Sequence, residues 1–182
     1  MATALTLRDG TPAVIWPLLP TDAKALREGY LELSTESRRN RFLAAVPTLS
    51  DSMLRLLIDE VDDVDHVALV LMAFPESGAE EGAGVGRLIR YQDQLSVADV
   101  AVTVADAWQR RGVGTALLRE LVQQRPAGVQ ELLTLVATSN TPSLALLSRL
   151  GPTHTAPAGP GVQEVRVQLP PDRRHLRVHP HG

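Results

Sequence analysis

The sequence contains no cysteine among its 182 residues. This absence excludes disulfide scaffolds, zinc sites built on cysteine, iron–sulfur clusters and catalytic thiols. The longest apolar runs, such as 67–74, fall far short of the roughly 20 residues that a membrane helix needs. Residues 1–10 also lack the basic and then apolar pattern of a signal peptide. We therefore expect a cytoplasmic protein that does not bind membranes.

The sequence also lacks an excess of positive charge. Its formal net charge is −3 and its pI is about 5.9, so no field over the whole chain would hold nucleic acid. Hydrophobic residues make up 44% and charged residues 21%, which is typical of one globular domain with a buried core. We expect a single domain over 1–169 and a loose tail, rich in proline and histidine, over 170–182.

Hydrophobic periodicity predicts an alternation of strands and helices. Apolar and β-branched runs predict strands at 11–18, 66–74, 85–91, 97–104, 132–137 and 162–167. Capping residues and helical spacing predict helices that begin at Thr21, at Ser34, at Ser50, after Gly114 and at Thr141. Together these elements indicate a layered α/β or α+β domain.

A glycine-rich turn, Gln109-Arg-Arg-Gly-Val-Gly114, lies between a predicted strand and a predicted helix. Glycines let backbone N–H groups approach a ligand, and a helix N-terminus adds partial positive charge, so such a turn binds phosphate oxygens. Neither a Gly-x-x-x-x-Gly-Lys loop nor Gly-x-Gly-x-x-Gly is present, since Leu117 stands three residues after Gly114. The alternative is an ordinary strand-to-helix turn that glycine makes easy.

Two motifs in order carry a family resemblance. The segment from Val100 to Leu118, with Gln109-Arg-Arg-Gly-Val-Gly114 inside it, resembles the acetyl-CoA motif of the GNAT superfamily of N-acetyltransferases. The segment 140–151, an asparagine opening a helix that ends in Leu-Gly, is similar to the next motif of that family. The opening 7–18 and Arg38-Arg39-x-Arg41-Phe42 resemble the branch that includes acetyltransferase domains of bacterial protein lysine acetyltransferases.

The resemblance implies a mixed, mostly antiparallel sheet of six to seven strands flanked by helices. The sheet would be splayed between the strands at 97–104 and 132–137, with acetyl-CoA in the split. Backbone groups of 102–104 would pair with the pantetheine arm, and N–H groups of 110–115 would hold the pyrophosphate. The implied cofactor-binding residues are Val102, Thr103, Val104, Gln109, Arg110, Arg111, Gly112, Val113, Gly114, Thr115, Asn140 and Ser143.

Three of these side chains have an alternative role. Arg110 and Arg111 match phosphate geometry, but they could also be a solvated basic helix start. Asn140 can offer a donor and an acceptor to a pantetheine amide, and it would equally serve as a helix cap.

The expected reaction is direct transfer of acetyl from acetyl-CoA to a primary amine, and we predict Asp99 as the general base. An alkyl ammonium must lose a proton before it attacks, and Asp99 stands where relatives often have glutamate. The alternative is a strand-end carboxylate bonded to backbone or paired with Arg90. Many relatives carry a tyrosine as general acid where this chain has Leu147. We expect the acceptor site to include Arg38, Arg41 and Phe42.

We expect no metal site. His175, His179 and His181 fall in the tail, and His66 adjoins a carboxylate-rich turn that is more typical of a solvated loop than of a ligand cluster. The acceptor is a protein lysine or a small molecule, and the resemblance suggests a homodimer. Two alternatives remain at this stage: an acetyl-CoA sensor without turnover, and a regulator that binds ATP or NAD at the glycine turn.

Overall fold

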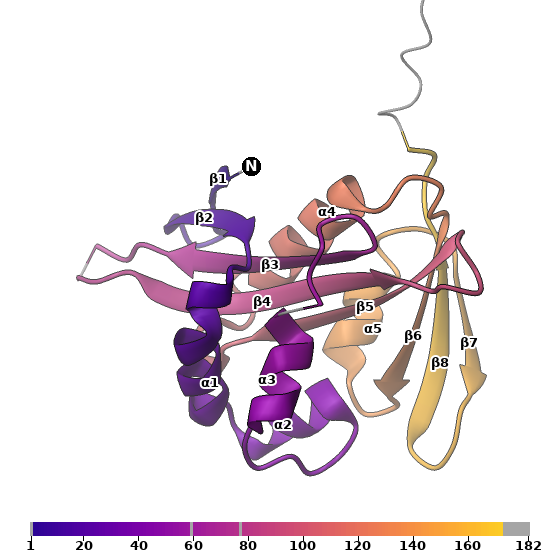
Figure 1. Cartoon of the computed structure of the whole chain (residues 1–182), viewed down its shortest axis with the longest axis horizontal. Coiled ribbons are helices and arrows are strands. Elements are labelled where there is room, and N and C mark those ends of the chain that lie inside the picture. Colours follow the sequence, from indigo (N-terminus) through magenta and orange to yellow (C-terminus); the bar gives the residue numbers. More distant parts are fainter. Residues whose placement is uncertain (1, 59, 77, 173–182) are drawn as a thin grey trace, which may run out of the picture.

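The computed structural model describes residues 2–58, 60–76 and 78–172, and it contains one eight-stranded sheet (Figure 1). The strand order is β1-β2-β3-β4-β5-β6-β8-β7. The strands are β1 Thr3–Thr6, β2 Pro12–Pro17, β3 His66–Ala73, β4 Glu81–Arg90, β5 Val97–Val104, β6 Glu131–Ala137, β7 Thr153–Pro157 and β8 Val162–Gln168.

The helices cover both faces of this sheet. They are α1 Ala23–Glu32, α2 Thr35–Phe42, α3 Asp51–Ile58, α4 Val113–Gln124 and α5 Thr141–Leu147, with short 3-10 turns at Pro20–Asp22 and Asp106–Trp108. On one face α4 packs over β3, β4 and β5 around a large apolar core that includes Leu69, Leu88, Leu117 and Leu121. On the other face α1 to α3 enclose a second cluster with Tyr30, Leu54 and Ala68. None of the helices in the described residues has the length and apolar character needed to cross a bilayer.

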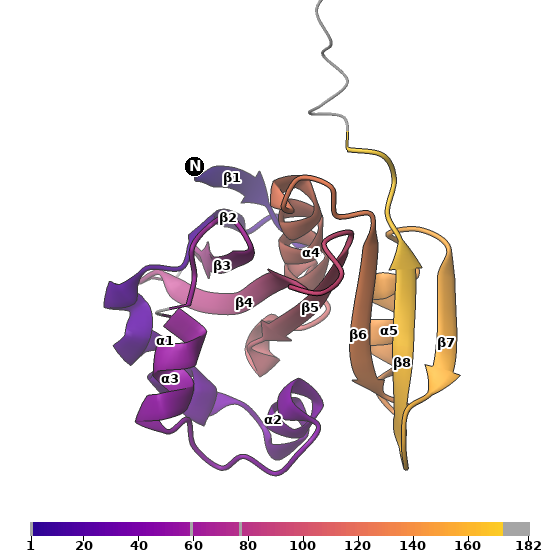
Figure 2. The same ribbon diagram turned by 45° about the vertical axis from the view of Figure 1, so that its right-hand side comes forward.

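A seam divides the sheet between β5 and β6. Every other neighbouring pair of strands is antiparallel, and β4 stays in register with β5 from Gly84↔Val104 to Arg90↔Ala98. By contrast, β5 and β6 run parallel and pair only at Val97↔Glu131 and Ala98↔Leu132. In Figure 2 the strands β6, β8 and β7 turn away from β1 to β5 beyond that point. The predicted mixed, mostly antiparallel sheet is confirmed.

The number of strands is larger than predicted because two edge strands carry weak signals. The four residues of β1 are too few to show a pattern, and β7 is mostly exposed and ends at Pro157. A third difference concerns β4, which begins at Glu81, ahead of the strand predicted at 85–91, and runs through Gly84. Glycine is required there, because a Cβ would lie 2.8 Å from the carbonyl oxygen of Thr103. Of the tail, residues 173–182 and their histidines lie outside the described residues.

Candidate active site

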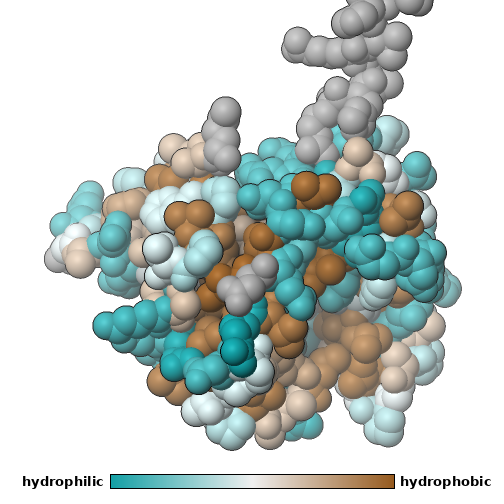
Figure 3. Space-filling model, viewed as in Figure 1, coloured by the Kyte–Doolittle hydropathy of each residue, from teal (hydrophilic) through white to brown (hydrophobic). Residues whose placement is uncertain are grey.

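A cavity of about 890 Å³ opens at the seam. Its walls come from α2, from β5, from the turn that enters α4, from β6 and from α5. Figure 3 shows apolar side chains exposed between the front helices and strands β6 to β8. Of the predicted site residues, those that line the cavity are Arg41, Phe42, Asp99, Val102, Thr103, Val104, Gln109, Arg110, Gly112, Gly114, Thr115, Asn140 and Ser143.

The turn before α4 presents a row of backbone donors. Arg110 and Gly112 both have positive φ values, 62° and 99°, which bend the chain into the helix. In the described part of the chain, the N–H groups of 110–115 donate to no protein acceptor. They lie at the N-terminus of a helix of 12 residues, where the helix dipole is positive. This arrangement suits an oxyanion such as phosphate.

The two arginines of the turn differ in their surroundings. Arg110 lines the cavity, whereas Arg111 does not. The Arg111 guanidinium contacts the Asp9 carboxylate and stacks 3.9 Å from the centre of the Trp108 ring. Hydrogen bonds from Thr11 and Arg111 lower the pKa of Asp9 to about 2. Arg111 therefore ties the first hairpin to the turn.

Val113 also lies away from the cavity, since its side chain is buried in the core under α4. The structure instead adds two cationic side chains that the sequence did not predict. Arg8 passes beside the turn, where a Cβ on Gly112 would meet its Cγ at 3.1 Å, and Arg149 follows α5. Both lie inside segments that carry the family resemblance, 7–18 and 140–151, but no local pattern marks either side chain as facing a cavity.

The edge of β5 that faces the seam is open at Val102. The carbonyls of Val100 and Val104 are reached from the seam side, by Thr134 Oγ1 at 3.0 Å and by Gln109 Nε2 at 3.5 Å. Because alternate residues of a strand direct their backbone groups to the same edge, those of Val102 also face the seam. They have no partner among the described residues. The backbone groups of Thr103 face β4 instead, so only the side chain of Thr103 can contact a ligand in the cavity.

Asn140 performs the capping role considered for it. Its Oδ1 accepts a hydrogen bond from the backbone N–H of Ser143 at 3.2 Å, at the start of α5. The amide nitrogen of the same side chain has no protein partner within the described residues, so it can donate into the cavity.

Asp99 lies half-buried on the cavity wall. Burial raises the pKa of its carboxyl, and hydrogen bonds from Thr134 and Val100 and the charge of Arg41 oppose that effect. The alternative pairing with Arg90 is not found, because Arg90 contacts Asp65 instead. A raised pKa brings this carboxylate closer to the range in which it can take a proton.

Only two of the three residues expected at the acceptor site line the cavity. Arg41 and Phe42 line the cavity, and the Arg41 guanidinium lies 4.7 Å from the centre of the Phe42 ring. Arg38 instead donates to the carbonyls of Leu31, Leu33 and Pro47. These bonds fix both ends of α2 and leave Arg38 outside the cavity lining.

Asp106 links α2 to the turn before α4. Its carboxylate accepts hydrogen bonds from the backbone N–H of Ser34, from the Ser37 hydroxyl at 2.6 Å and from Gln109 Nε2 at 2.8 Å. Ser34 is the N-cap of α2, as its position predicted. One side chain thus joins the helix that carries Arg41 to the turn with the free N–H groups.

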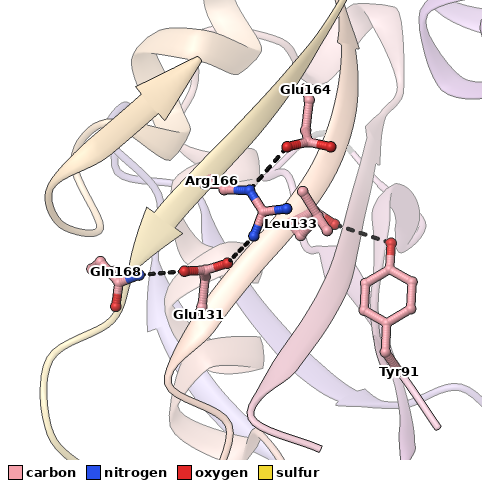
Figure 4. Close-up of polar contacts among 6 residues, drawn as sticks. All are labelled: Tyr91, Glu131, Leu133, Glu164, Arg166 and Gln168. Atoms are coloured by element: carbon pink, nitrogen blue, oxygen red, sulfur yellow. Dashed lines mark hydrogen bonds and ion pairs between the residues drawn. The ribbon is translucent and has the colours of Figure 1, made fainter. Parts of the chain in front are cut away.

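Tyr91 crosses the seam at the far end of the cavity. Its hydroxyl donates to the Leu133 carbonyl of β6 at 3.4 Å (Figure 4). On the neighbouring strand β8, Arg166 is held between Glu131 at 2.7 Å and Glu164 at 2.9 Å. Leu147, at the position of the family's usual tyrosine, is 5% exposed and supplies no proton donor.

The carboxylate-rich turn before β3 is structural. Asp62 accepts hydrogen bonds from the N–H groups of Val64, Asp65 and His66. His66 is 5% exposed, and across the described chain no three histidine or acidic side chains form a group that could hold a metal ion.

Comparison with known proteins agrees with this geometry. The chain is 31% identical over 166 residues to the acetyltransferase Pat of Mycolicibacterium smegmatis, covering 91% of this chain and 48% of that protein. The chain thus spans about half the length of this curated relative. The GNAT domain of S. lividans PAT superposes with a TM-score of 0.79 at 28% identity, covering 92% of this chain and 97% of that one.

A more distant structure from Salmonella typhimurium, solved with its cofactor acetyl-CoA, shares the fold. It has a TM-score of 0.63 at 19% identity and covers 87% of this chain and 94% of that one. The model of the acetyltransferase (GNAT) family matches residues 30–151, which include both cavity motifs. The chain therefore belongs to the GNAT family of acetyltransferases.

Proposed function

We propose that the protein transfers acetyl from acetyl-CoA to a primary amine by direct attack. The observation that carries this proposal is the row of N–H groups at 110–115, which have no acceptor among the described residues and lie beside the open edge of β5 in one cavity. An oxyanion site and an unpaired strand edge are the two features that a pyrophosphate with an amide-containing arm requires. The structure with acetyl-CoA in the same fold supports this assignment.

In this proposal the cofactor lies along the seam. The N–H groups of 110–115 and the guanidinium of Arg110 hold the pyrophosphate, and the backbone of Val102 pairs with a pantetheine amide. The Asn140 amide nitrogen and the Ser143 side chain complete that wall. Arg111 and Val113 contribute through their backbone N–H groups only.

Asp99 acts as the base. A lysine-like amine has a pKa near 10.4 and enters as ammonium, so its proton must leave before the nitrogen lone pair can attack the thioester carbonyl. Asp99 takes this proton, through a water where the short side chain does not reach. The nitrogen forms its bond to the carbonyl carbon, and the carbon–sulfur bond breaks. The nitrogen gives up its second proton to water or to the departing thiolate, which otherwise leaves as the anion or takes a proton from water, since an ordinary thiol has a pKa of about 8–9.

The test is release of free thiol from acetyl-CoA with a panel of amines that includes lysine peptides. Turnover with any amine supports the proposal. Binding of acetyl-CoA without turnover on the whole panel would support the acetyl-CoA sensor instead. Tighter binding of ATP than of acetyl-CoA would indicate the nucleotide regulator. The extent of the domain, 1–169, a cytoplasmic location and a homodimer belong to the proposal as well.

A further inference from the structure

Two guanidinium groups, the buried Arg87 and the half-buried Arg41, lie on the proposed acceptor side of the cavity. Arg87, on β4, is 5% exposed. Its register partners are Ala68, in the cluster under α1 to α3, and Ala101, on the cavity wall. Arg87 therefore points to the sheet face that carries α2, on the same side as Asp99, because alternate residues share a face.

The partner of Arg87 cannot compensate its charge. Its Nη1 lies 3.2 Å from Nε2 of His66, and Nδ1 of His66 lies 3.0 Å from the Glu60 carbonyl. The carbonyl can only accept, so the imidazole donates from Nδ1 and accepts from Arg87 at Nε2 as the neutral tautomer. Burial and the charge of Arg41 lower the pKa of Arg87 to about 10, so it stays a cation at neutral pH.

Arg41 extends this positive charge to the cavity surface. Neither Arg41 nor Arg87 has a carboxylate within 4 Å in the described residues, and Asp99 attracts Arg41 only from beyond that distance. By contrast, Arg166 and Arg90, which are half-buried like Arg41, both contact carboxylates. Of the three carboxylates that line the cavity, Glu36, Asp99 and Asp106, only Asp99 acts on Arg41. The buried Arg87 has the neutral His66 as its partner, so the two guanidinium groups carry more positive charge than the adjacent Asp99 balances, which is costly for a buried cation.

We propose that the acceptor is a small primary amine that carries a carboxylate, with its carboxylate on Arg41 and its amine at Asp99. This inference rests on the proposed acetyl transfer and names its substrate class. Such a zwitterion brings an anion to the uncompensated guanidinium and a cation to the Asp99 carboxylate. Phe42, Leu43 and Leu135 line the same cavity and suit the carbon chain between the two charges. A lone lysine side chain supplies no anion for Arg41.

The experiment compares straight-chain ω-amino carboxylates with their carboxamides, which keep the length and lose the charge. A charge-assisted pair predicts a kcat/KM that is about 10–100-fold higher for the carboxylate of matching length. Arg41→Gln should reduce this ratio to about one. Arg39→Gln is the matched control, because Arg39 lies on the same helix, is exposed and is outside the cavity lining, and it should retain the ratio.

A second measurement does not depend on turnover. Calorimetry measures how the N-acetylated carboxylate and the N-acetylated carboxamide bind to the protein in the presence of CoA. If the protein binds the carboxylate more tightly than the carboxamide, and Arg41→Gln loses this preference, the result supports the inference. It does so even if no thiol is released in the turnover assay, because the lack of thiol release would contradict only the proposed acetyl transfer. Equal binding of both compounds to the unmodified protein, or a preference retained in Arg41→Gln, would overturn it. Should Arg41→Gln not unfold cooperatively, Arg41→Lys replaces it, with a reduced preference expected.

Discussion

The two sides of the cavity are built from different parts of the chain. The side to which we assign the cofactor consists of backbone groups of consecutive residues, in the turn at 110–115 and along β5. The proposed acceptor side consists of side chains that α2, β4 and β5 bring together, among them Arg41, Arg87 and Asp99. A site built from backbone groups tolerates many side-chain substitutions but depends on the backbone conformation, whereas a site built from side chains changes with each substitution. The comparison suggests that the acetyl donor stays the same while substitutions can change which acceptor is bound.

The largest expected effect is on the acceptor side. Asp99→Asn removes the proposed base and should reduce kcat by about 10²–10⁴-fold near neutral pH, with part of the loss recovered at high pH, where the free amine is more abundant. The affinity for acetyl-CoA should hardly change. Steady-state kinetics and calorimetry measure the two quantities.

Asp93→Asn is the control for Asp99→Asn, since Asp93 is exposed and outside the cavity lining. Full activity of Asp99→Asn at pH 7 would show that another group takes the proton. If Asp99→Asn also lost affinity for acetyl-CoA, the cofactor and the acceptor would not bind to separate sides of the cavity.

A conformational change should break the cofactor side. Gly112→Val forces a β-branched residue into a φ of 99° and places its Cβ beside Arg8. We expect a loss of about 1–3 kcal/mol in stability from backbone strain. Displacing the N–H groups should also weaken acetyl-CoA binding by about 10–100-fold, since each hydrogen bond to a charged group contributes about 1.5–3 kcal/mol.

Gly128→Val separates these two effects. Gly128 has a similar φ of 87°, and a Cβ there would meet nothing within 4 Å. Thermal unfolding should show a comparable destabilisation, while calorimetry should show unchanged affinity for acetyl-CoA. Unchanged affinity in a folded Gly112→Val protein would contradict the pyrophosphate assignment.

Substitution of the two neighbouring arginines of the turn should have a smaller effect on the affinity for acetyl-CoA, and the effect should differ between them. Arg110→Gln removes a charge at the cavity wall and should weaken acetyl-CoA binding by about fivefold, roughly 1 kcal/mol. Arg111→Gln should leave the affinity unchanged and lower the melting temperature, because Arg111 contacts Asp9 and Trp108 rather than the cavity. An equal loss of affinity in both variants would mean that Arg111 turns toward the cofactor when it binds.

The smallest effect is a pH dependence of stability under the acceptor side. Burial, and then the charge of Arg87, lower the pKa of His66 below its ordinary 6.5. Below pH 6.5 the unfolded chain therefore binds more protons than the folded one. The contribution of His66 to the free energy of unfolding is complete above pH 6.5 and falls as the pH drops toward its lowered pKa.

His66→Gln should lose this component, and chemical denaturation between pH 5 and 7.5 measures it. His154→Gln, on the exposed edge strand β7, should retain the pH dependence of the unmodified protein. Parallel profiles for the unmodified protein and His66→Gln would show that His66 does not carry the effect.

The strand and the turn to which we assign the cofactor could be predicted from the sequence because their determinants are local. Alternation of apolar residues placed β5 at Val97–Val104, and the glycines marked the turn that follows. The roles of Arg38 and Arg111 could not be predicted, since the partners of Arg38 lie around α2 and those of Arg111 include Asp9, about a hundred residues away.

The acceptor side was predicted only in part. Asp99, Arg41 and Phe42 line the cavity as expected, but Arg87 gave no signal, because a single arginine in an apolar run resembles an edge-strand residue. The role that we propose for it depends on its burial and on the lack of a carboxylate within 4 Å in the part of the chain that the structure describes, and only the folded chain reveals both. The edge strands β1 and β7 were not predicted because short exposed segments show little hydrophobic alternation.

The seam also makes one amide of the sheet a natural reporter. The N–H of Val102 belongs to a central strand, yet it has no partner among the described residues, while the neighbouring residues of β5 bond to β4. Hydrogen exchange at this amide should be fast in the free protein, unlike that of other central-strand amides. Filling the seam with acetyl-CoA should slow it selectively, so that a single resonance reports occupancy without any turnover.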